Sequence, residues 1–422
     1  MIHVYVGPTL NRGEEPLLHA PGVRALPPAR HGDLFDPAIA AGDTVVLIDG
    51  LYHQAPALRH KEILAALARG VRVIGAASIG ALRAAELHAF GMTGVGAVFR
   101  SYVEGLVDGD DEVAVGQEPD AGLRALTWAL VNAAHVLRLA EGEGLVSGRT
   151  ASELLAHLRQ VYYPQRTTAA VLAVFRRYGS RELASWFEER LRADRHFGNL
   201  KRLDALDAVR VALRPAAPGG FVPADAQWDT GYYRLWANRF ASRRVDGTEL
   251  PTAQRLAYQQ VFDPHFPEVW QDHLDHLSLH PGDGGEGMPL AERMARLTGG
   301  QPAPPVHAVF RPRPDLRDDE SVARLLRRET AADRLSITRY GALNEALRRS
   351  RPGFSPEAVR DDVTGTALCR LWGCRPERLD AYAAARGFGG GARAVDETKP
   401  FMAGLLQDQP DATAKEPAPD AA

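Results

Sequence analysis

One serine of this 422-residue chain, Ser78, lies where a nucleophile would be useful. It follows an apolar run at 71–74 that Gly75 closes, and it precedes the small-residue segment 80–87, so the spacing predicts a strand, a tight turn and a helix. Ligands of parallel sheets bind beyond the carboxyl ends of the strands, and a serine in this turn exposes its hydroxyl there. The backbone N–H groups of Ile79 and Gly80 would then open the helix and could hold an oxyanion.

Other interpretations of this turn stay open. The pattern Ala76-x-Ser78-x-Gly80 is close to the nucleophile elbow of α/β hydrolases, with alanine in place of the first glycine. In a purely structural role, Ser78 would only cap the helix. A Ser-His-Asp esterase has little support, because no later Asp and His stand out. The segment Gly75–Gly80 lacks G-x-G-x-x-G, which disfavours a dinucleotide site.

Four charged residues are expected near the same edge of the sheet. Asp49 ends a continuous apolar strand, as Ser78 ends its own, and Lys61 lies early in the intervening helix. Arg83 and Glu86 follow in the helix after Ser78. For Asp49, a turn-forming Asp-Gly pair and a site role are equally supported. For Arg83 and Glu86, ion pairing on a solvated face is the favoured interpretation.

The apolar runs that would position these residues predict an α/β fold, in which a small, mostly parallel sheet is flanked by helices. The apolar runs lie at 2–6, 44–48 and 71–74. Pro56 and Gly70 delimit a helix at 56–69. Its 3.6-residue period puts His60 on the buried face and Glu62 in water.

The rest of the chain predicts mainly helices, including one that runs unbroken from Arg181 to Leu213. We expect a partner or accessory domain in the second half, and a tail too rich in Pro, Ala and Asp to fold. The expected divisions are a core domain at 1–215 (an α/β part at 1–120 and a helical part at 121–215), a mainly helical domain at 225–400 and a disordered tail at 407–422.

Composition excludes several classes of function. The net charge of −3 gives no basic excess for nucleic-acid binding. Without a signal peptide or an apolar run long enough to span a bilayer, the chain is expected in the cytoplasm and not in a membrane. Cys369 and Cys374 form neither a disulfide framework nor a zinc site. The acidic turn Asp108–Glu112 lacks EF-hand spacing, so no metal site is predicted.

Many ordered blocks over residues 1–210 resemble the TfuA-like family. Ile79 stands where methionine is expected, and nothing beyond residue 215 resembles the family. The blocks are Val6-Gly7-Pro8-Thr9-Leu10, Gly32-Asp33, Ile48-Asp49-Gly50, His60-Lys61-Glu62-Ile63-Leu64, Gly75 to Leu87, Phe90-Gly91-Met92-x-Gly94-Val95-Gly96, Asp110-Asp111-Glu112-Val113, Tyr163-Pro164-x-Arg166 and Lys201-Arg202-x-Asp204-Ala205.

The resemblance implies a role beside YcaO enzymes, which use ATP and magnesium to phosphorylate the amide oxygen during thioamidation of a peptide or protein backbone. TfuA-like proteins are implicated in sulfur supply. They would hydrolyse the thiocarboxylate of a ThiS-like carrier protein and aid YcaO's engagement of its substrate, without a cofactor of their own. A serine–lysine pair serves as the site, and by position the pair maps to Ser78 and Lys61.

Lysine is scarce here, so its placement is informative. It occurs only at Lys61, Lys201, Lys399 and Lys415, and unlike arginine it can give up its proton to act as a base. We expect Lys61 within about 2.6–3.2 Å of Ser78, because the first turns of its helix reach the carboxyl edge of the sheet. The rival, Lys201, is expected in a surface ion pair with Asp204.

Two other functions remain as alternatives. One is a non-catalytic adaptor that binds YcaO and its peptide, with Ser78 purely structural. The other is a generic serine hydrolase. Sulfide release from a thiocarboxylated carrier without YcaO would separate the hydrolase from the adaptor.

Overall fold

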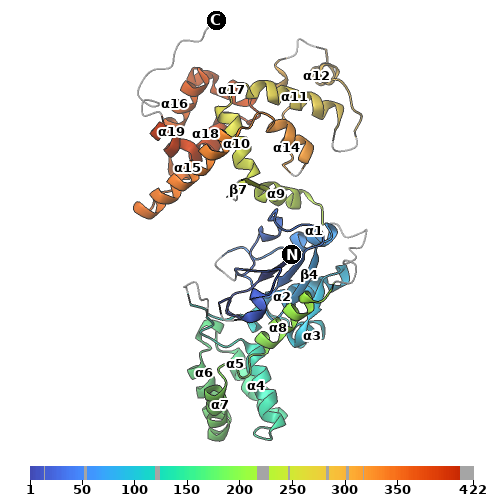
Figure 1. The fold of residues 1–422 in the computed structure, drawn as a ribbon, viewed down its shortest axis with the longest axis vertical. Coiled ribbons are helices and arrows are strands. Elements are labelled where there is room, and N and C mark those ends of the chain that lie inside the picture. Colours follow the sequence, from blue (N-terminus) through green and yellow to red (C-terminus); the bar gives the residue numbers. More distant parts are fainter. Residues whose placement is uncertain are drawn as a thin grey trace. The chain divides into compact units, whose positions relative to one another are not determined.

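The computed structural model describes residues 1–13, 15–51, 55–118, 124–215, 228–245, 248–281, 285–300, 304–316 and 318–408. The chain divides into two compact units, Met1–Arg234 and Leu235–Ala422 (Figure 1). Gln407 and Asp408, expected in the tail, instead complete helix α19 (Met402–Asp408). The other residues of the predicted tail lie outside the described residues.

The first unit is built on a five-stranded parallel sheet, which confirms the predicted fold class. The strands follow the order β2-β1-β3-β4-β5, the doubly wound order in which ligands bind where β1 and β3 diverge. Their bounds are β1 Ile2–Tyr5, β2 Val23–Leu26, β3 Thr44–Leu47, β4 Arg72–Ala76 and β5 Thr93–Val95. The short strands β2 and β5 lie outside the runs from which strands were predicted.

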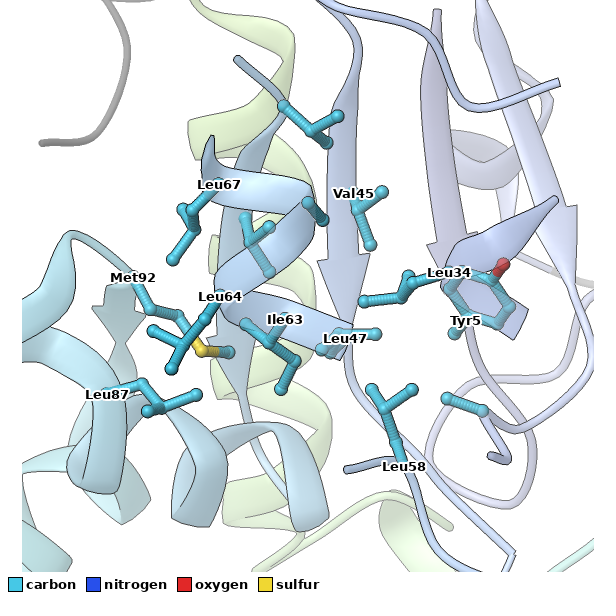
Figure 2. Packing of buried hydrophobic residues seen from close by; sticks show 14 of the residues in the cluster. Tyr5, Leu34, Val45, Leu47, Leu58, Ile63, Leu64, Leu67, Leu87 and Met92 are labelled. Carbon is cyan, nitrogen blue, oxygen red and sulfur yellow. The ribbon is translucent and has the colours of Figure 1, made fainter. Parts of the chain in front are cut away.

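Alternating strand residues bury the two faces of the sheet under different helices. Helices α1 (His60–Ala68) and α2 (Ile79–Leu87) cover one face, where Ile63 and Leu64 pack on Val45 and Leu47 (Figure 2). Helix α8 (Leu200–Leu213) covers the opposite face through a row of small and branched side chains that pack on Val46, Ile48 and Ile74. Side chains carried by α1 and side chains carried by α8 therefore reach the edge of the sheet from opposite faces.

Two glycines let α2 approach the strands closely. A β-carbon on Gly80 would lie 1.8 Å from the carbonyl oxygen of Leu47, and one on Gly75 would lie 2.1 Å from that of Gly80. No larger residue fits at either position without moving backbone. The turn at 76–79 is therefore fixed against the end of β3.

The helical part of the first unit differs from prediction at one point that matters for the site. The helices are α3 Gly96–Val103, α4 Leu130–Gly142, α5 Gly148–Arg159, α6 Thr168–Tyr178 and α7 Arg181–Ala193, followed by α8. The predicted continuous helix 181–213 is broken between Ala193 and Leu200. Asn199 caps α8 by accepting from Arg202 N at 3.1 Å, so Lys201 lies in the first turn of a helix that starts at the sheet.

The start of helix α1 and the orientation of two of its first residues also differ from prediction. It starts at His60 rather than Pro56, and the predicted orientations of His60 and Glu62 are both wrong. The His60 ring is about half exposed and contacts Glu86 at 2.8 Å, whereas Glu62 is buried. As the third helical residue, Glu62 accepts from Arg59 N at 3.2 Å in a capping box and also pairs with His31.

The second unit is mainly helical with its own apolar cores. A hairpin, β6 (Ser242–Val245) and β7 (Thr248–Pro251), was not anticipated. The helices are α9 Gly231–Phe240, which begins in the first unit, α10 Thr252–Phe262, α11 Phe266–Leu279, α12 Leu290–Thr298, α13 Val306–Val309, α14 Asp319–Leu325, α15 Ala331–Ser350, α16 Asp361–Trp372, α17 Leu379–Ala385, α18 Gly391–Thr398 and α19. Among the described residues, every helix is too short or too polar to cross a lipid bilayer.

One buried histidine of the second unit predicts acid sensitivity. His273 is 1% exposed beside Trp270, and neither ring nitrogen has a hydrogen-bond partner among the described residues. Burial, reinforced by His276 and Arg324 and opposed by Asp318, lowers its pKa from 6.5 to about 4. The native state therefore holds the neutral ring, while the unfolded chain binds the proton below pH 6.5.

The unfolding free energy of this unit should accordingly fall as pH drops from 6.5 towards 4. The loss attributable to His273 is at most about 3 kcal/mol. Thermal melts at pH 7 and pH 4.5 should show a smaller difference for His273→Leu than for the wild type. The exposed-site control His265→Gln should behave as wild type, and equal acid sensitivity in all three proteins would contradict the assignment.

Candidate active site

A cavity of about 310 Å³ lies at the carboxyl edge of the sheet. Its walls come from the ends of three neighbouring strands and from the helical part of the first unit. The residues that matter for chemistry are Pro8 after β1, Asp49 and Gly50 after β3, Ser78 and Ile79 after β4, Arg83 on α2, and Asp110, Tyr163 and Lys201 from the helical part. This is the place where a doubly wound sheet binds ligands.

Ser78 sits in a strained turn. Ala77 has φ 67°, the one non-glycine residue with positive φ among those described, and Ser78 N donates to Ala76 O at 2.7 Å. Together these define a γ-turn with positive φ, a rare and costly conformation that clusters at functional sites. The Ser78 side chain is 9% exposed and makes no capping hydrogen bond to α2. The alternative role as a helix cap is thus not the one the structure adopts.

Of the two predicted oxyanion donors, one is occupied. Gly80 N donates to Ile48 O at 3.3 Å, because the helix packs so closely on the end of β3, so the prediction that its N–H is free is wrong. Ile79 N, at the first position of α2, has no acceptor among the described residues, and Ile79 lines the cavity. Of the two backbone donors predicted beside Ser78, Ile79 N is therefore the one without an acceptor among the described residues.

Lys61 is engaged elsewhere. Its Nζ donates to Thr230 Oγ1 at 2.7 Å, and the residue is not among those lining the Ser78 cavity. Helix α1 lies across its face of the sheet as predicted, but its Lys61 side chain reaches the segment that leads into α9. That contact ties residues 228–230 to the first unit, with Trp228 packed against the same apolar core.

Lys201 is the lysine that lines the cavity together with Ser78. It is 3% exposed, and its Nζ donates to Val113 O at 2.7 Å. Burial lowers its pKa from the ordinary 10.5, and the charge of Asp49 opposes that shift only in part. Ser78 and the buried amine of Lys201 therefore line the same cavity.

The expected surface ion pair of Lys201 with Asp204 does not exist. Asp204 is buried and accepts from Ala97 N at 2.9 Å and from Val98 N at 2.7 Å at the start of α3. Gly96 makes this contact feasible, since a β-carbon there would lie 2.1 Å from the Asp204 carboxyl carbon. Asp204 therefore joins α8 to α3 and leaves Lys201 without a carboxylate partner on its own helix.

Asp49 has a structural task alongside its place in the cavity. Its Oδ2 accepts from Gly7 N at 2.9 Å and Thr9 N at 3.0 Å, and its Oδ1 accepts from Thr9 Oγ1 at 2.6 Å. These bonds hold the loop after β1 against the end of β3. Asp49 thus shapes the cavity wall at Pro8, and its charge opposes the lowering of the Lys201 pKa by burial.

Of Arg83 and Glu86, only Arg83 is a wall residue of the cavity. Arg83 lines the cavity, donates to Leu58 O at 3.3 Å, and pairs with Glu86 at 2.5 Å. Glu86 is not among the lining residues and bridges Arg83 to His60. The favoured interpretation, an ion pair at a solvated face, therefore describes Glu86, while Arg83 places a cation in the cavity wall.

The acidic turn is held by an ion pair. Glu112 contacts Arg159 at 2.9 Å, and Asp110 in the same 3-10 turn lines the cavity. In the described part of the chain, no three His, Cys, Asp or Glu side chains gather where they could hold a metal ion.

Sequence reasoning missed several residues of the cavity wall, among them Lys201, Tyr163 and Val113. Lys201 was assigned to the surface, and Tyr163 and Val113 were given no role in the site. A usable signal was present: Gly198-Asn199 is a helix stop followed by a capping residue, which would have ended the long predicted helix and placed Lys201 at a new helix start.

The fold and the cavity define a doubly wound α/β protein with a ligand site at the topological switch point. Residues 49–167 match the family model described as TfuA-like protein. The matched segment lies within the first unit. Ser78 and Lys61 fall inside the matched segment and Lys201 beyond it. No curated protein matches the chain.

The buried amine of Lys201 predicts a distinctive pH dependence of stability. In the unfolded chain this lysine keeps its ordinary pKa near 10.5, whereas burial lowers the native value, so the unfolded state binds the extra proton between the two. The free energy of unfolding should therefore rise with pH up to about 10.5.

Lys201→Met removes this proton linkage while filling the same volume, at the cost of the bond to Val113 O, about 1 kcal/mol. Denaturant titrations should show Lys201→Met more stable than the wild type at pH 7, with the advantage shrinking towards pH 10. A difference that does not vary with pH would mean that Lys201 stays charged in the native protein.

Proposed function

We propose that the protein is a serine hydrolase that cleaves the thiocarboxylate of a small carrier protein and delivers sulfide for YcaO-dependent backbone thioamidation. The TfuA-like domain indicates a role in a YcaO-associated thioamidation system. The observation that carries the chemistry is the shared cavity: Ser78, in a strained turn without a capping bond, and the buried Lys201 line the same space.

The reaction follows as two acyl transfers. Lys201 takes the proton of Ser78 as Oγ bonds to the thiocarboxylate carbon, and the Ile79 N–H donates to the oxyanion. The C–S bond then breaks, and the proton passes from Lys201 to the departing sulfur, so the products are a Ser78 ester and hydrosulfide. Water attacks the ester, returns the hydroxyl to Ser78 and releases the carrier carboxylate.

The cavity walls suit an extended, small-residue acyl terminus. Gly50 and Pro8 narrow the space on the sheet side, where a β-carbon on Gly50 would lie 2.7 Å from the Ile79 side chain. Arg83 supplies a cation in the wall that would attract the anionic thiocarboxylate. YcaO and its peptide or protein substrate would then contact the chain elsewhere, the second unit being the candidate, and ATP and magnesium remain requirements of YcaO.

The test measures hydrosulfide released from a thiocarboxylated ThiS-like carrier by the purified protein without YcaO. Ser78→Ala and Lys201→Met should each lower the rate at least 1,000-fold while the thermal melt shows a folded protein. Lys201→Arg should be equally inactive, because arginine cannot accept the proton. Wild-type release should rise with pH through the lowered pKa of Lys201.

Lys61→Met is the matched control and should keep activity within about threefold. If Lys61→Met loses activity and Lys201→Met keeps it, the base is Lys61, as the sequence predicted, and the assignment of Lys201 is wrong. Wild-type protein that releases no hydrosulfide, yet raises YcaO turnover with an external sulfide source, would support the adaptor instead.

A further inference from the structure

One wall of the Ser78 cavity is an unbroken stretch of chain. All residues from 113 to 117 line the cavity. Ala114 is buried and residues 115–117 are half-buried, in an extended segment that bridges antiparallel to Ala125 through Gln117. Backbone N–H and C=O groups with so little exposure are normally hydrogen-bonded, so their partners identify what the segment is built to contact.

This segment is paired along one edge. Gly116 O accepts from Leu126 N at 2.8 Å, and Glu118 N donates to Arg124 O at 2.9 Å. Gly116 N donates on the same side, to Thr127 Oγ1 at 2.7 Å. The backbone groups of Gly116 and the N–H of Glu118 are therefore used within the chain.

The other edge of the segment is unpaired. Successive residues of a strand direct their backbone groups to opposite edges, so Val115 and Gln117 present theirs on the side that Gly116 does not use. Among the described residues, neither the N–H nor the C=O of Val115 or Gln117 has a hydrogen-bond partner. We call these backbone groups, two donors and two acceptors, the open edge.

The open edge lies on the side of Ser78. Residues 125–127, which cover the paired edge, line a neighbouring cavity of about 210 Å³ and not the cavity of Ser78. Gly50, from another wall of the Ser78 cavity, also has an N–H and a C=O without a partner among the described residues. The Ser78 cavity thus offers backbone hydrogen bonds that the described chain does not make itself.

Unpaired groups at every second residue match one class of ligand. An extended polypeptide presents its own N–H and C=O groups with the same two-residue period, which is how a peptide adds a strand to an open edge. We propose that the open edge binds the acyl terminus of the carrier protein as an added β-strand. The proposal rests on the proposed function for the identity of the peptide, and on the open edge for its conformation.

The position of Lys201 gives the direction of the added strand. Lys201 Nζ binds Val113 O at 2.7 Å, so the Val113 end of the segment lies at the proposed base and the Gln117 end lies farther along the chain. A terminus whose acyl carbon reaches Ser78 therefore enters from the Gln117 end and runs antiparallel to residues 113–117. One of its residues pairs with Val115, and the residue two positions before it pairs with Gln117.

The test measures binding of a peptide that copies the C-terminal tail of the ThiS-like carrier and ends in an ordinary carboxylate. Its amino end carries fluorescein, and anisotropy reports its binding to full-length Ser78→Ala protein. In a series of peptides, each is N-methylated at one residue. We expect a loss of affinity of about fivefold or more at two positions that are two residues apart, with a smaller effect at the position between them. Losses at adjacent positions, or at none, contradict an added strand.

The protein side is tested at Gln117. Gln117→Pro removes one N–H of the open edge and leaves the bonds of Gly116 and Glu118 in place, a position in which proline is compatible with an edge strand. Gln117→Ala lacks the same side chain but keeps the N–H. The proline variant should bind the peptide about fivefold or more weakly than the alanine variant, with thermal melts showing that both are folded. Equal affinities would show that the N–H of Gln117 is not used.

These measurements separate the added strand from the proposed hydrolysis, because the peptide cannot turn over. Alternating losses in a protein that releases no hydrosulfide would keep the strand and reject the hydrolysis. Hydrosulfide release without alternating losses would do the reverse. If the tail peptide fails to bind and the peptide substrate of YcaO binds with the alternating pattern, the proposed occupant is wrong. In active protein, Gln117→Pro should raise KM for the carrier relative to Gln117→Ala by the factor seen in binding.

Discussion

The site depends on how closely the start of α2 packs against the end of β3. Gly80 lies so near the Leu47 carbonyl that no side chain fits between them, and its N–H is spent on Ile48 O. This contact forces the chain to turn sharply between strand and helix, and Ala77 accepts a positive φ as the cost. The turn leaves Ser78 without a capping bond to α2 and places Ser78 and Ile79 in the cavity wall.

The two faces of the sheet then decide which lysine lines the Ser78 cavity. Helix α1 brings Lys61 to the edge from one side, where it binds Thr230. Helix α8 brings Lys201 from the other side, under the turn that contains Val113, and buries it there. Burying an amine without a carboxylate partner destabilises the fold, so its presence favours a chemical over a structural role.

Sequence patterns predicted the parallel sheet, the Ser78 turn and the family whose model matches residues 49–167, because apolar runs and small residues at a strand–helix junction are local signals. They failed where the answer depends on long-range packing. The Gly80 N–H donates to the carbonyl of Ile48, 32 positions earlier in the sequence. The burial of Lys201 depends on the end of one helix and the start of the next at 194–199, which the helical periodicity of the sequence does not reveal. The prediction that Glu62 faces water was wrong because its hydrogen bonds in the capping box and with His31 compensate for the burial of the carboxylate.

The central claim, that Lys201 and not Lys61 activates Ser78, can be tested on the chain alone with a fluorophosphonate probe, whose phosphorus bonds to an activated serine Oγ as fluoride leaves. Mass spectrometry of the labelled protein across pH gives the site and the rate. The account predicts labelling at Ser78 that speeds up as pH rises, is lost in Lys201→Met and persists in Lys61→Met. Labelling that persists in Lys201→Met and disappears in Lys61→Met would contradict it.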